Sequence, residues 1–281
     1  MSDAITPALK WPGSKRWLVD QLSELYVPYR KRWFVDLFTG SGAAVLGVHP
    51  DRAILNDANP HVMNFHKWVR MGLCIDHDMA RGVDGLVVPL VNDQDIYYAH
   101  RERFNALIDA GQANSQEAAL LFWYMNRTGY NGLVRFNRGG HFNTPFGRYA
   151  KLDYAGYAVK FHQIGRAMQT WRLLSRDFTL VPVKPGDFLY ADPPYDNQAG
   201  GGFTGYAAGS FAWYDQVRLA DFLAKHDGPV VASNAATDRI IDLYRERGFQ
   251  VETVSVRRSI SCKGSRRTAA MEIIATKGVR K

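Results

Sequence analysis

The sequence has 281 residues, of which 46% are hydrophobic and 13% aromatic, enough to bury a sizeable core in one large domain or two modest ones. Its formal net charge of +8 is compatible with a polyanionic partner such as nucleic acid. Cys74 and Cys262 lack the spacing of a disulfide framework or a zinc site. We therefore expect no bound metal. Because no stretch has the apolar length of a signal peptide or a membrane span, we expect a cytoplasmic protein without a membrane anchor.

The first motif is a Pro-Gly-Ser turn among the basic residues of segment 10–16. Apolar residues at helical spacing follow from Trp17, and Ser14 is a possible N-cap. The start of such a helix could hold an anion or a carboxylate. A solvated basic helix start explains the same residues and is the simpler interpretation of this segment alone.

A glycine loop follows a short apolar run over residues 33–37 and predicts the strand, turn and helix that open a doubly wound sheet. Gly40 and Gly42 would let a ligand approach the backbone closely. The pattern is neither a dinucleotide fingerprint nor a phosphate-binding loop with its lysine, so it does not specify a nucleotide. A tight turn that binds nothing is the alternative.

A second short strand is predicted over residues 53–56, and it ends at Asp57. In nucleotide-type folds an acid roughly 20 residues after the glycine loop accepts hydrogen bonds from ribose hydroxyls. Asp57 suits that role better than the role of a surface turn residue. Asn59 and Pro60 then break the strand and predict a helix over 61–71.

The middle of the chain contains an unusual polar segment, residues 127–149. It follows a predicted helix over 94–108 and a predicted buried helix over 117–126; residues 85–91 fit a short strand or a loop. Arginines, asparagines, glycines and aromatic residues alternate in the segment, and Tyr-Asn-Gly is a hairpin signal. We expect no apolar face that packs as regular core, and a surface that contacts DNA. A polar glycine-rich loop is the alternative.

The most informative motif is Asp192-Pro193-Pro194-Tyr195, directly after a predicted buried strand over 188–191. The prolines stop the strand and display the acid and the tyrosine at its carboxyl end, where open α/β sheets bind ligands. A carboxylate and a proline carbonyl can accept hydrogen bonds from the amino group of a base, and a tyrosine can stack on a flipped base. An ordinary turn that ends a strand is the alternative for these four residues alone.

The other elements of the second half complete an α/β pattern. Before the Asp192 motif we predict a helix over 157–174 and a strand over 178–183, and after it a mobile loop over 196–210 that could close over a site. Further helices are predicted over 213–226 and 237–247, with strands over 229–233, 249–254 and 272–275. The basic segment 256–268 would contact phosphate through Arg257 and Arg258, or would be a solvated hairpin tip.

These motifs together resemble the DNA adenine-N6 methyltransferases of the alpha (D12) class, and most closely the Dam type that acts on GATC. The resemblance covers nearly the whole chain in the family's order. It is carried by LKWPGSK, DLFTGSG, NDANP, NRTGYNGLVRFNRGGHFNTPFGRY, YADPPY and VRRSISCKGSRR. Thr128 and Val134 stand where relatives carry other side chains, which could relax the preference for the site.

The resemblance implies an α/β fold with a seven-stranded mixed-sheet, Rossmann-like methyltransferase core and an inserted, mostly helical target-recognition domain. Residues 1–60 and 156–281 would form the catalytic domain that binds S-adenosylmethionine, and residues 61–155 would recognise the target DNA. Double-stranded DNA containing GATC is the implied partner. No obligate protein partner is evident, and we expect a nucleoid-associated enzyme of bacterial or phage origin.

Individual roles also follow from the resemblance. Asp192, Pro193, Pro194 and Tyr195 would be catalytic, and the side chains around S-adenosylmethionine would be Trp11, Lys15, Phe38, Gly40, Gly42, Asp57 and Asp192. Tyr130 would insert into the duplex beside Asn131, and Arg135 would read a guanine. The full set expected to contact DNA is Lys10, Arg127, Tyr130, Asn131, Leu133, Arg135, Asn137, Asn143, Pro145, Tyr149, Arg257 and Arg258.

The resulting hypothesis is direct methyl transfer to N6 of a flipped-out adenine, without a covalent enzyme intermediate. Asp192 would orient the amino group, and positioning would supply most of the rate. Methylation of cytosine N4 or of another adenine site is the alternative activity. A DNA-binding relative that has lost catalysis is the alternative from another class.

Overall fold

The computed structural model describes residues 5–75, 91–148, 154–196, 211–256 and 270–280. Within these residues the chain forms one seven-stranded sheet in the order β3-β2-β1-β4-β5-β7-β6, and β7 runs antiparallel to both its neighbours. The other printed pairs are parallel, so the expected mixed α/β sheet is confirmed. The strands are β1 (Phe34–Asp36), β2 (Ala53–Asn56), β3 (Arg172–Leu174), β4 (Phe188–Ala191), β5 (Val230–Ala235), β6 (Gln250–Val256) and β7 (Ala270–Lys277).

Helices cover both faces of the sheet, because its central strands alternate their side chains between two apolar cores. Phe34 and Phe188 belong to the core under α1, α2, α3, α5 and α6, and their rings stack 5.4 Å apart. Val35 and Leu189 belong to the core under α7 and α8. The helices are α1 (Val19–Tyr26), α2 (Ala43–Val48), α3 (Pro60–Arg70), α4 (Gln94–Asp109), α5 (Gln116–Thr128), α6 (Tyr154–Ala167), α7 (Trp213–Ala224) and α8 (Asp238–Glu246).

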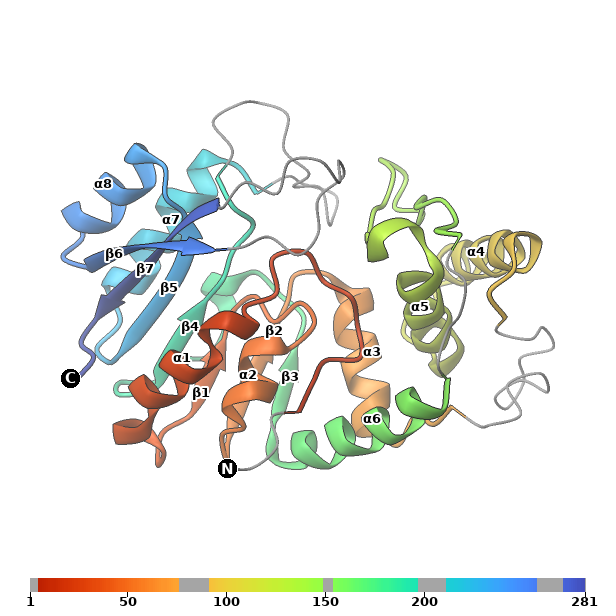
Figure 1. Cartoon of the computed structure of the whole chain (residues 1–281), viewed down its shortest axis with the longest axis horizontal. Coiled ribbons are helices and arrows are strands. Elements are labelled where there is room, and N and C mark those ends of the chain that lie inside the picture. The colour runs from red at the N-terminus through yellow and green to blue at the C-terminus, as the bar shows by residue number, and fades with distance from the viewer. Residues whose placement is uncertain (1–4, 76–90, 149–153, 197–210, 257–269, 281) are drawn as a thin grey trace.

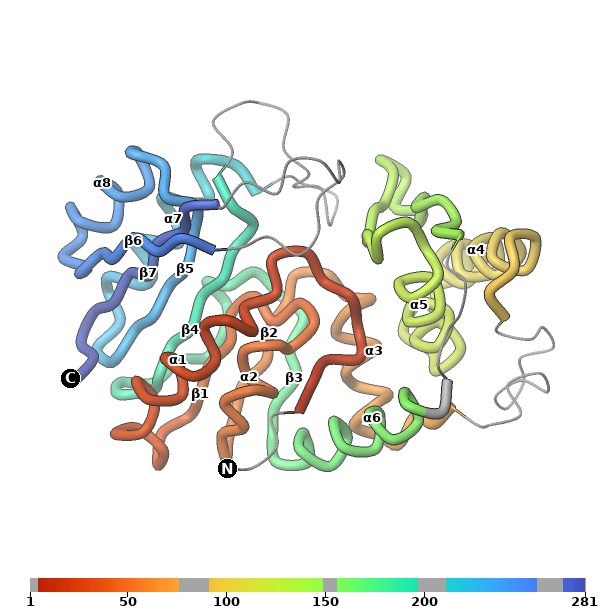
Figure 2. The backbone as a smooth tube through the Cα atoms, viewed as in Figure 1, coloured from red at the N-terminus to blue at the C-terminus, as the bar shows by residue number. Residues whose placement is uncertain are grey.

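The long connection from β2 to β3 carries the helices α3, α4, α5 and α6. Figure 2 traces this connection from α3 to α4 and α5 and back through α6 to β3. Figure 1 places α4 and α5 at one end of the molecule, with α8 at the other. Side-chain caps start three of these helices, because Asn59, Asp93 and Ser115 each accept a hydrogen bond from the first turn.

Two predictions around β3 are wrong. The helix expected over 157–174 ends at Ala167, and residues 172–174 pair with β2 as the edge strand instead. The strand expected over 178–183 is a single 3₁₀ turn, Phe178–Leu180, which the Asp177 carboxylate caps by accepting from the Thr179 N–H. Apolar residues continue at helical spacing through residues 168–174, so the local pattern conceals a strand that only its neighbour β2 defines.

Other local predictions also need correction. Ser14 does not cap a helix: the first helical turn, Arg16–Leu18, has Lys15 at its N-cap and no side-chain cap. Residues 85–90 of the predicted strand or loop over 85–91 lie outside the described residues, and so do residues 197–210 of the mobile loop predicted over 196–210. Among the described helices, none is long and apolar enough to cross a membrane.

Candidate active site

The candidate site lies at the carboxyl ends of β4, β1 and β2, the three strands on which the sequence motifs were predicted. Asp192 follows β4, the glycine loop follows β1, and Asp57 follows β2. The strands are parallel neighbours, with Val35 opposite both Ile54 and Leu189, so these three turns meet at one edge of the sheet.

The Asp192 carboxylate is held through one of its two oxygens. Its Oδ1 accepts a hydrogen bond of 2.8 Å from the Ser233 hydroxyl on β5 and lies 3.0 Å from the Lys15 ammonium. Within the described residues its Oδ2 has no hydrogen-bond partner, and the side chain is 21% exposed. One oxygen therefore fixes the carboxylate while the other is free to accept a hydrogen bond.

Lys15 and Tyr195 join Asp192 in a buried polar cluster with Glu272 of β7. The Tyr195 hydroxyl donates a 2.7 Å hydrogen bond to Glu272 Oε2. The Lys15 ammonium lies 3.8 Å from that oxygen and 4.6 Å from the centre of the Tyr195 ring, and it donates to the Gly13 carbonyl. Burial, and then the negative charges of Asp192 and Glu272, raise the pKa of Tyr195 well above its usual value, so the hydroxyl stays protonated and remains a donor.

Polar side chains of β5 and α7 hold the backbone of the Asp192 motif. Gln216 donates a 2.8 Å hydrogen bond to the Pro194 carbonyl and accepts one of 2.9 Å from Asn234. The side-chain oxygen of Asn234 in turn accepts from the Asp196 N–H. These buried side chains were not singled out from the sequence. The available signal was the run Ser233-Asn234, two polar residues in an otherwise apolar strand.

The glycine loop is tied to Asp57 and to the N-terminal segment. Both Asp57 oxygens accept 2.8 Å hydrogen bonds, one from the Gly40 N–H and one from the Asn59 N–H. Gly40 and Gly42 have φ values of 49° and 78°, which favour glycine. A Cβ on Gly40 would lie 2.5 Å from Nε1 of Trp11, so the loop packs directly on that ring. Burial raises the pKa of Asp57, although both N–H bonds oppose the shift.

A cavity of about 260 Å³ lies beside the glycine loop, at the carboxyl ends of β1 and β2. Phe38, predicted to contact a cofactor, packs in its wall against Phe178 and Phe211, with both ring centroids 5.6 Å away. Asp177, Phe178 and Phe211 were not identified from the sequence as site residues. Phe178 was missed because residues 178–183 were predicted as a strand. The full lining is Leu37, Phe38, Asn56, Ala58, Arg176, Asp177, Phe178, Phe211 and Asp215.

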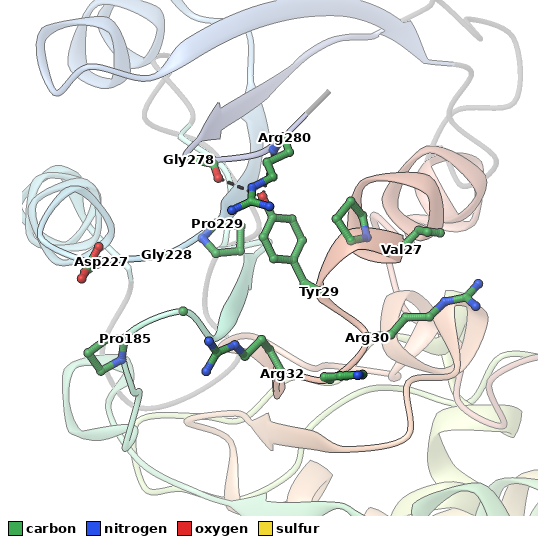
Figure 3. A pocket seen from close by; sticks show the side chains of 13 residues that line it. Val27, Tyr29, Arg30, Arg32, Pro185, Asp227, Gly228, Pro229, Gly278 and Arg280 are labelled. Carbon is green, nitrogen blue, oxygen red and sulfur yellow. Dashed lines mark hydrogen bonds between the residues drawn. The ribbon is translucent and has the colours of Figure 1, made fainter.

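A larger cavity, about 750 Å³, opens at the opposite edge of the sheet and contains none of the motif residues. Figure 3 shows Tyr29 at its centre, where the hydroxyl donates to the Gly278 carbonyl and accepts from the Arg280 N–H. Gly186 and Pro229 in its wall precede β4 and β5, whereas the motifs singled out from the sequence follow the strands. Size alone therefore does not identify the site in this molecule.

The turn at Tyr130–Gly132 presents an exposed aromatic side chain. Tyr130 is 43% exposed, and Asn131 and Gly132 have φ values of 53° and 65°, as in the tight turns favoured by Asn-Gly. The hairpin expected there is wrong, because Gly129 bridges to Phe146 rather than to a strand directly after the turn. Two other residues expected at the DNA lie beside the turn: the Pro145 carbonyl accepts from the Tyr130 N–H, and the Leu133 N–H bonds to the Tyr130 carbonyl.

The remainder of segment 127–149 places its polar and apolar residues on different sides. Arg135 is exposed, and its guanidinium donates to the Asn143 side chain (2.8 Å) and carbonyl (3.1 Å). Asn137 caps a turn by accepting from the His141 N–H. The expectation that no apolar face packs is wrong: Val134 and Phe142 are 2% and 1% exposed.

Buried side chains in this segment are consequently unavailable for base contacts. Val134 belongs to the core, and the Thr128 hydroxyl, 1% exposed, bonds to the Tyr124 carbonyl. Tyr149, Arg257 and Arg258 lie outside the described residues.

Lys10 connects the N-terminal segment to this surface. Its backbone N–H and carbonyl exchange two 2.8 Å hydrogen bonds with the side chain of Asn126, and its ammonium lies 3.5 Å from the carbonyl of Arg127. The Arg127 guanidinium stacks over the Tyr157 ring. Burial, and secondarily the charge of Arg127, lower the pKa of Lys10 to about 8.

Known proteins similar to this chain include DNA adenine methylases. The family model of the D12 class N6 adenine-specific DNA methyltransferases matches residues 11–260. The chain is 32% identical to the Retron Ec67 DNA adenine methylase of Escherichia coli, over 97% of this chain and 91% of that protein. It is 34% identical to the DNA adenine methylase of Escherichia coli strain K12 (95% and 93% covered) and 33% identical to that of Haemophilus influenzae (98% and 94%). The chain therefore belongs to the D12 class of N6 adenine-specific DNA methyltransferases.

Proposed function

We propose that this methyltransferase transfers the methyl group of S-adenosylmethionine to N6 of an adenine that is flipped out of double-stranded DNA at GATC. The observation that carries the proposal is the arrangement at the end of β4. Asp192 has one oxygen fixed by Ser233 and Lys15 and the other without a partner in the described structure, and Tyr195 stands beside it. An acceptor next to an aromatic ring suits the amino group and the face of one base.

In this proposal, Oδ2 of Asp192 and a carbonyl of the proline pair accept the two N–H groups of the adenine. Accepting these bonds directs the nitrogen lone pair along the line of attack and increases its electron density. S-adenosylmethionine supplies the electrophile, a methyl group on positively charged sulfur. With that donor bound, the new nitrogen–methyl bond would replace the carbon–sulfur bond, and the nitrogen would then give up one proton to solvent. The protein contributes mainly orientation.

The residues at the carboxyl edge fit the methyl donor. The cavity lined by Phe38 and Phe178 offers aromatic surface for a purine ring, and its volume of about 260 Å³ suits part of such a molecule. Asp57, at the adjacent turn, has further lone pairs that could accept from ribose hydroxyls. Gly40 and Gly42 carry no side chains, so that the donor could approach the backbone of the glycine loop closely. Trp11 and Lys15 would complete the proposed cofactor site.

We assign DNA recognition to residues 61–155, with Lys10 as a contribution from the N-terminal segment. The exposed Tyr130 at the tip of a tight turn suits insertion into a base stack. Arg135 is exposed, and Asn143 orients its guanidinium, which suits bidentate contact with a guanine edge. Leu133, Asn131 and Pro145 would border the same bases, and Arg127, Asn137, Asn143, Tyr149, Arg257 and Arg258 would contact bases or backbone around them.

The decisive experiment is methyl transfer from labelled S-adenosylmethionine to two duplexes that differ only in GATC and GTAC. We expect transfer to GATC alone, and loss of transfer in the Asp192→Ala protein. Equal transfer to both duplexes would refute the specificity. Label on cytosine would refute adenine as the target base. Full activity of Asp192→Ala would refute the assignment of the site.

A further inference from the structure

Glu272 is a buried acid in the active-site cluster to which neither the motifs nor the family resemblance assigns a role. It lies near the start of β7, paired with Ala235 of β5 and Val254 of β6, and its side chain is 6% exposed. A carboxylate in such a place requires partners, because burying an isolated charge is costly. Its partners are the Tyr195 hydroxyl at 2.7 Å and the Lys15 ammonium at 3.8 Å.

The hydrogen bond from Tyr195 fixes the ring that is proposed to stack on the target base. A tyrosine ring has two side-chain torsions, and its hydroxyl is the one polar group that can hold it from the far end. A hydrogen bond to a carboxylate is stronger than one to a neutral acceptor. Glu272 therefore restricts the ring from β7, whereas Asp192 follows β4.

Lys15 limits the ring further. Its ammonium lies 4.6 Å from the ring centre, over one face of Tyr195. The same ammonium is held by Asp192 at 3.0 Å, by Glu272 at 3.8 Å and by the Gly13 carbonyl at 2.6 Å, and Lys15 is 3% exposed. A cation so confined occupies that face, so a base can stack only on the other one.

We infer that Glu272 is a positioning residue for methyl transfer: it fixes the Tyr195 hydroxyl, and Lys15, held most closely by Asp192 and the Gly13 carbonyl, covers one face of the fixed ring, so that the flipped base is confined to the other face. This inference rests on the proposed function, because it assumes that Tyr195 stacks on the target base. Glu272 would act through Tyr195 and would not touch the reacting atoms.

The test is a double-mutant cycle on the single-turnover methylation rate of a GATC duplex. We expect Glu272→Ala to lower the rate about 10- to 100-fold, the range for losing a hydrogen bond to a charged group. Glu272→Gln should lose less than Glu272→Ala, because an amide oxygen still accepts from the hydroxyl. In the Tyr195→Phe background, which lacks the hydroxyl, Glu272→Ala should change the rate by no more than about threefold.

Controls separate positioning from folding. Glu252→Ala removes an exposed acid from the neighbouring strand β6 and should leave the rate unchanged. Circular dichroism of each variant establishes that it is folded, and Glu272→Gln preserves the volume if Glu272→Ala does not fold. If Glu272→Ala lowers the methylation rate equally in the parent and Tyr195→Phe backgrounds, or in neither, the inference is refuted. The proposed function still stands in that case, provided that the parent protein methylates the GATC duplex. An inactive parent protein would refute the proposed function, and the inference with it.

Discussion

Replacing Lys15 by methionine should destabilise the protein strongly, because it leaves the buried carboxylate of Glu272 and the half-buried carboxylate of Asp192 without their cation. The ammonium lies 3.0 Å from Asp192 and 3.8 Å from Glu272, and Lys15 itself is 3% exposed. At an effective dielectric constant of about 20, these two attractions amount to about 5.5 and about 4.4 kcal/mol before desolvation is counted. Desolvation offsets much of that sum, and removing one partner of a buried pair costs about 3–5 kcal/mol in practice.

Thermal unfolding followed by circular dichroism measures this loss. For a chain of this size, a loss of about 3–5 kcal/mol corresponds to a fall in melting temperature on the order of 10 °C. Lys225→Met, which removes an exposed lysine at the end of α7, is the matched control and should have almost no effect.

A second substitution tests whether the lost stability comes from unpaired charge. Adding Glu272→Gln to Lys15→Met removes one of the two unpaired carboxylates and should restore about half of the lost stability. A melting temperature within about 2 °C of the parent protein for Lys15→Met alone would refute the electrostatic argument. A further decrease on adding Glu272→Gln would refute it as well.

Two further predictions concern activity. Ser233→Ala should lower the methylation rate about tenfold, because it removes the 2.8 Å hydrogen bond that fixes Asp192, whereas Thr237→Val, which removes a hydroxyl bonded to Asp196, should not; equal rates for the two variants would contradict this. The Lys10 pKa of about 8 predicts that the affinity for DNA is full at pH 7 and falls as the pH rises through 8 to 9, since the lysine then loses its charge. Lys10→Arg should flatten that dependence in a fluorescence-anisotropy titration with duplex DNA, and identical pH profiles would exclude Lys10 as the titrating group.

The central strands of the sheet could be predicted because each is a short apolar run that is followed by glycine, proline or polar turn residues. β4 is the clearest case, since its apolar run stops at two prolines, and β1 and β2 end at a glycine loop and at Asn59-Pro60. β3 could not be predicted in the same way. Its residues continue the apolar spacing of α6, and only pairing with β2 makes them a strand.

The polar cluster shows a second limit of local patterns. The Asp192 motif was predicted to be the reactive site, but three of the groups that hold it come from distant parts of the chain: Lys15, Ser233 and Glu272. Sequence spacing carries no information on which buried acid meets which hydroxyl. Similarly, Phe142 was read as part of an unpacked polar segment, because the aromatic rings against which it packs belong to other elements, such as Phe104 of α4.

The two hydrogen bonds between Lys10 and Asn126 bear on how the proposed enzyme would discriminate between DNA sites. Asn126 also donates to the Gly132 carbonyl in the exposed turn, and Lys15, only five residues after Lys10, contacts the Asp192 carboxylate. The segment between them is pinned where Trp11 packs on Gly40. A wrong base pair that displaced the turn would therefore disturb the same short segment that sets the charge around Asp192. Discrimination between sites would then appear in the turnover number as well as in binding, since an ill-fitting duplex could be held and still be methylated slowly.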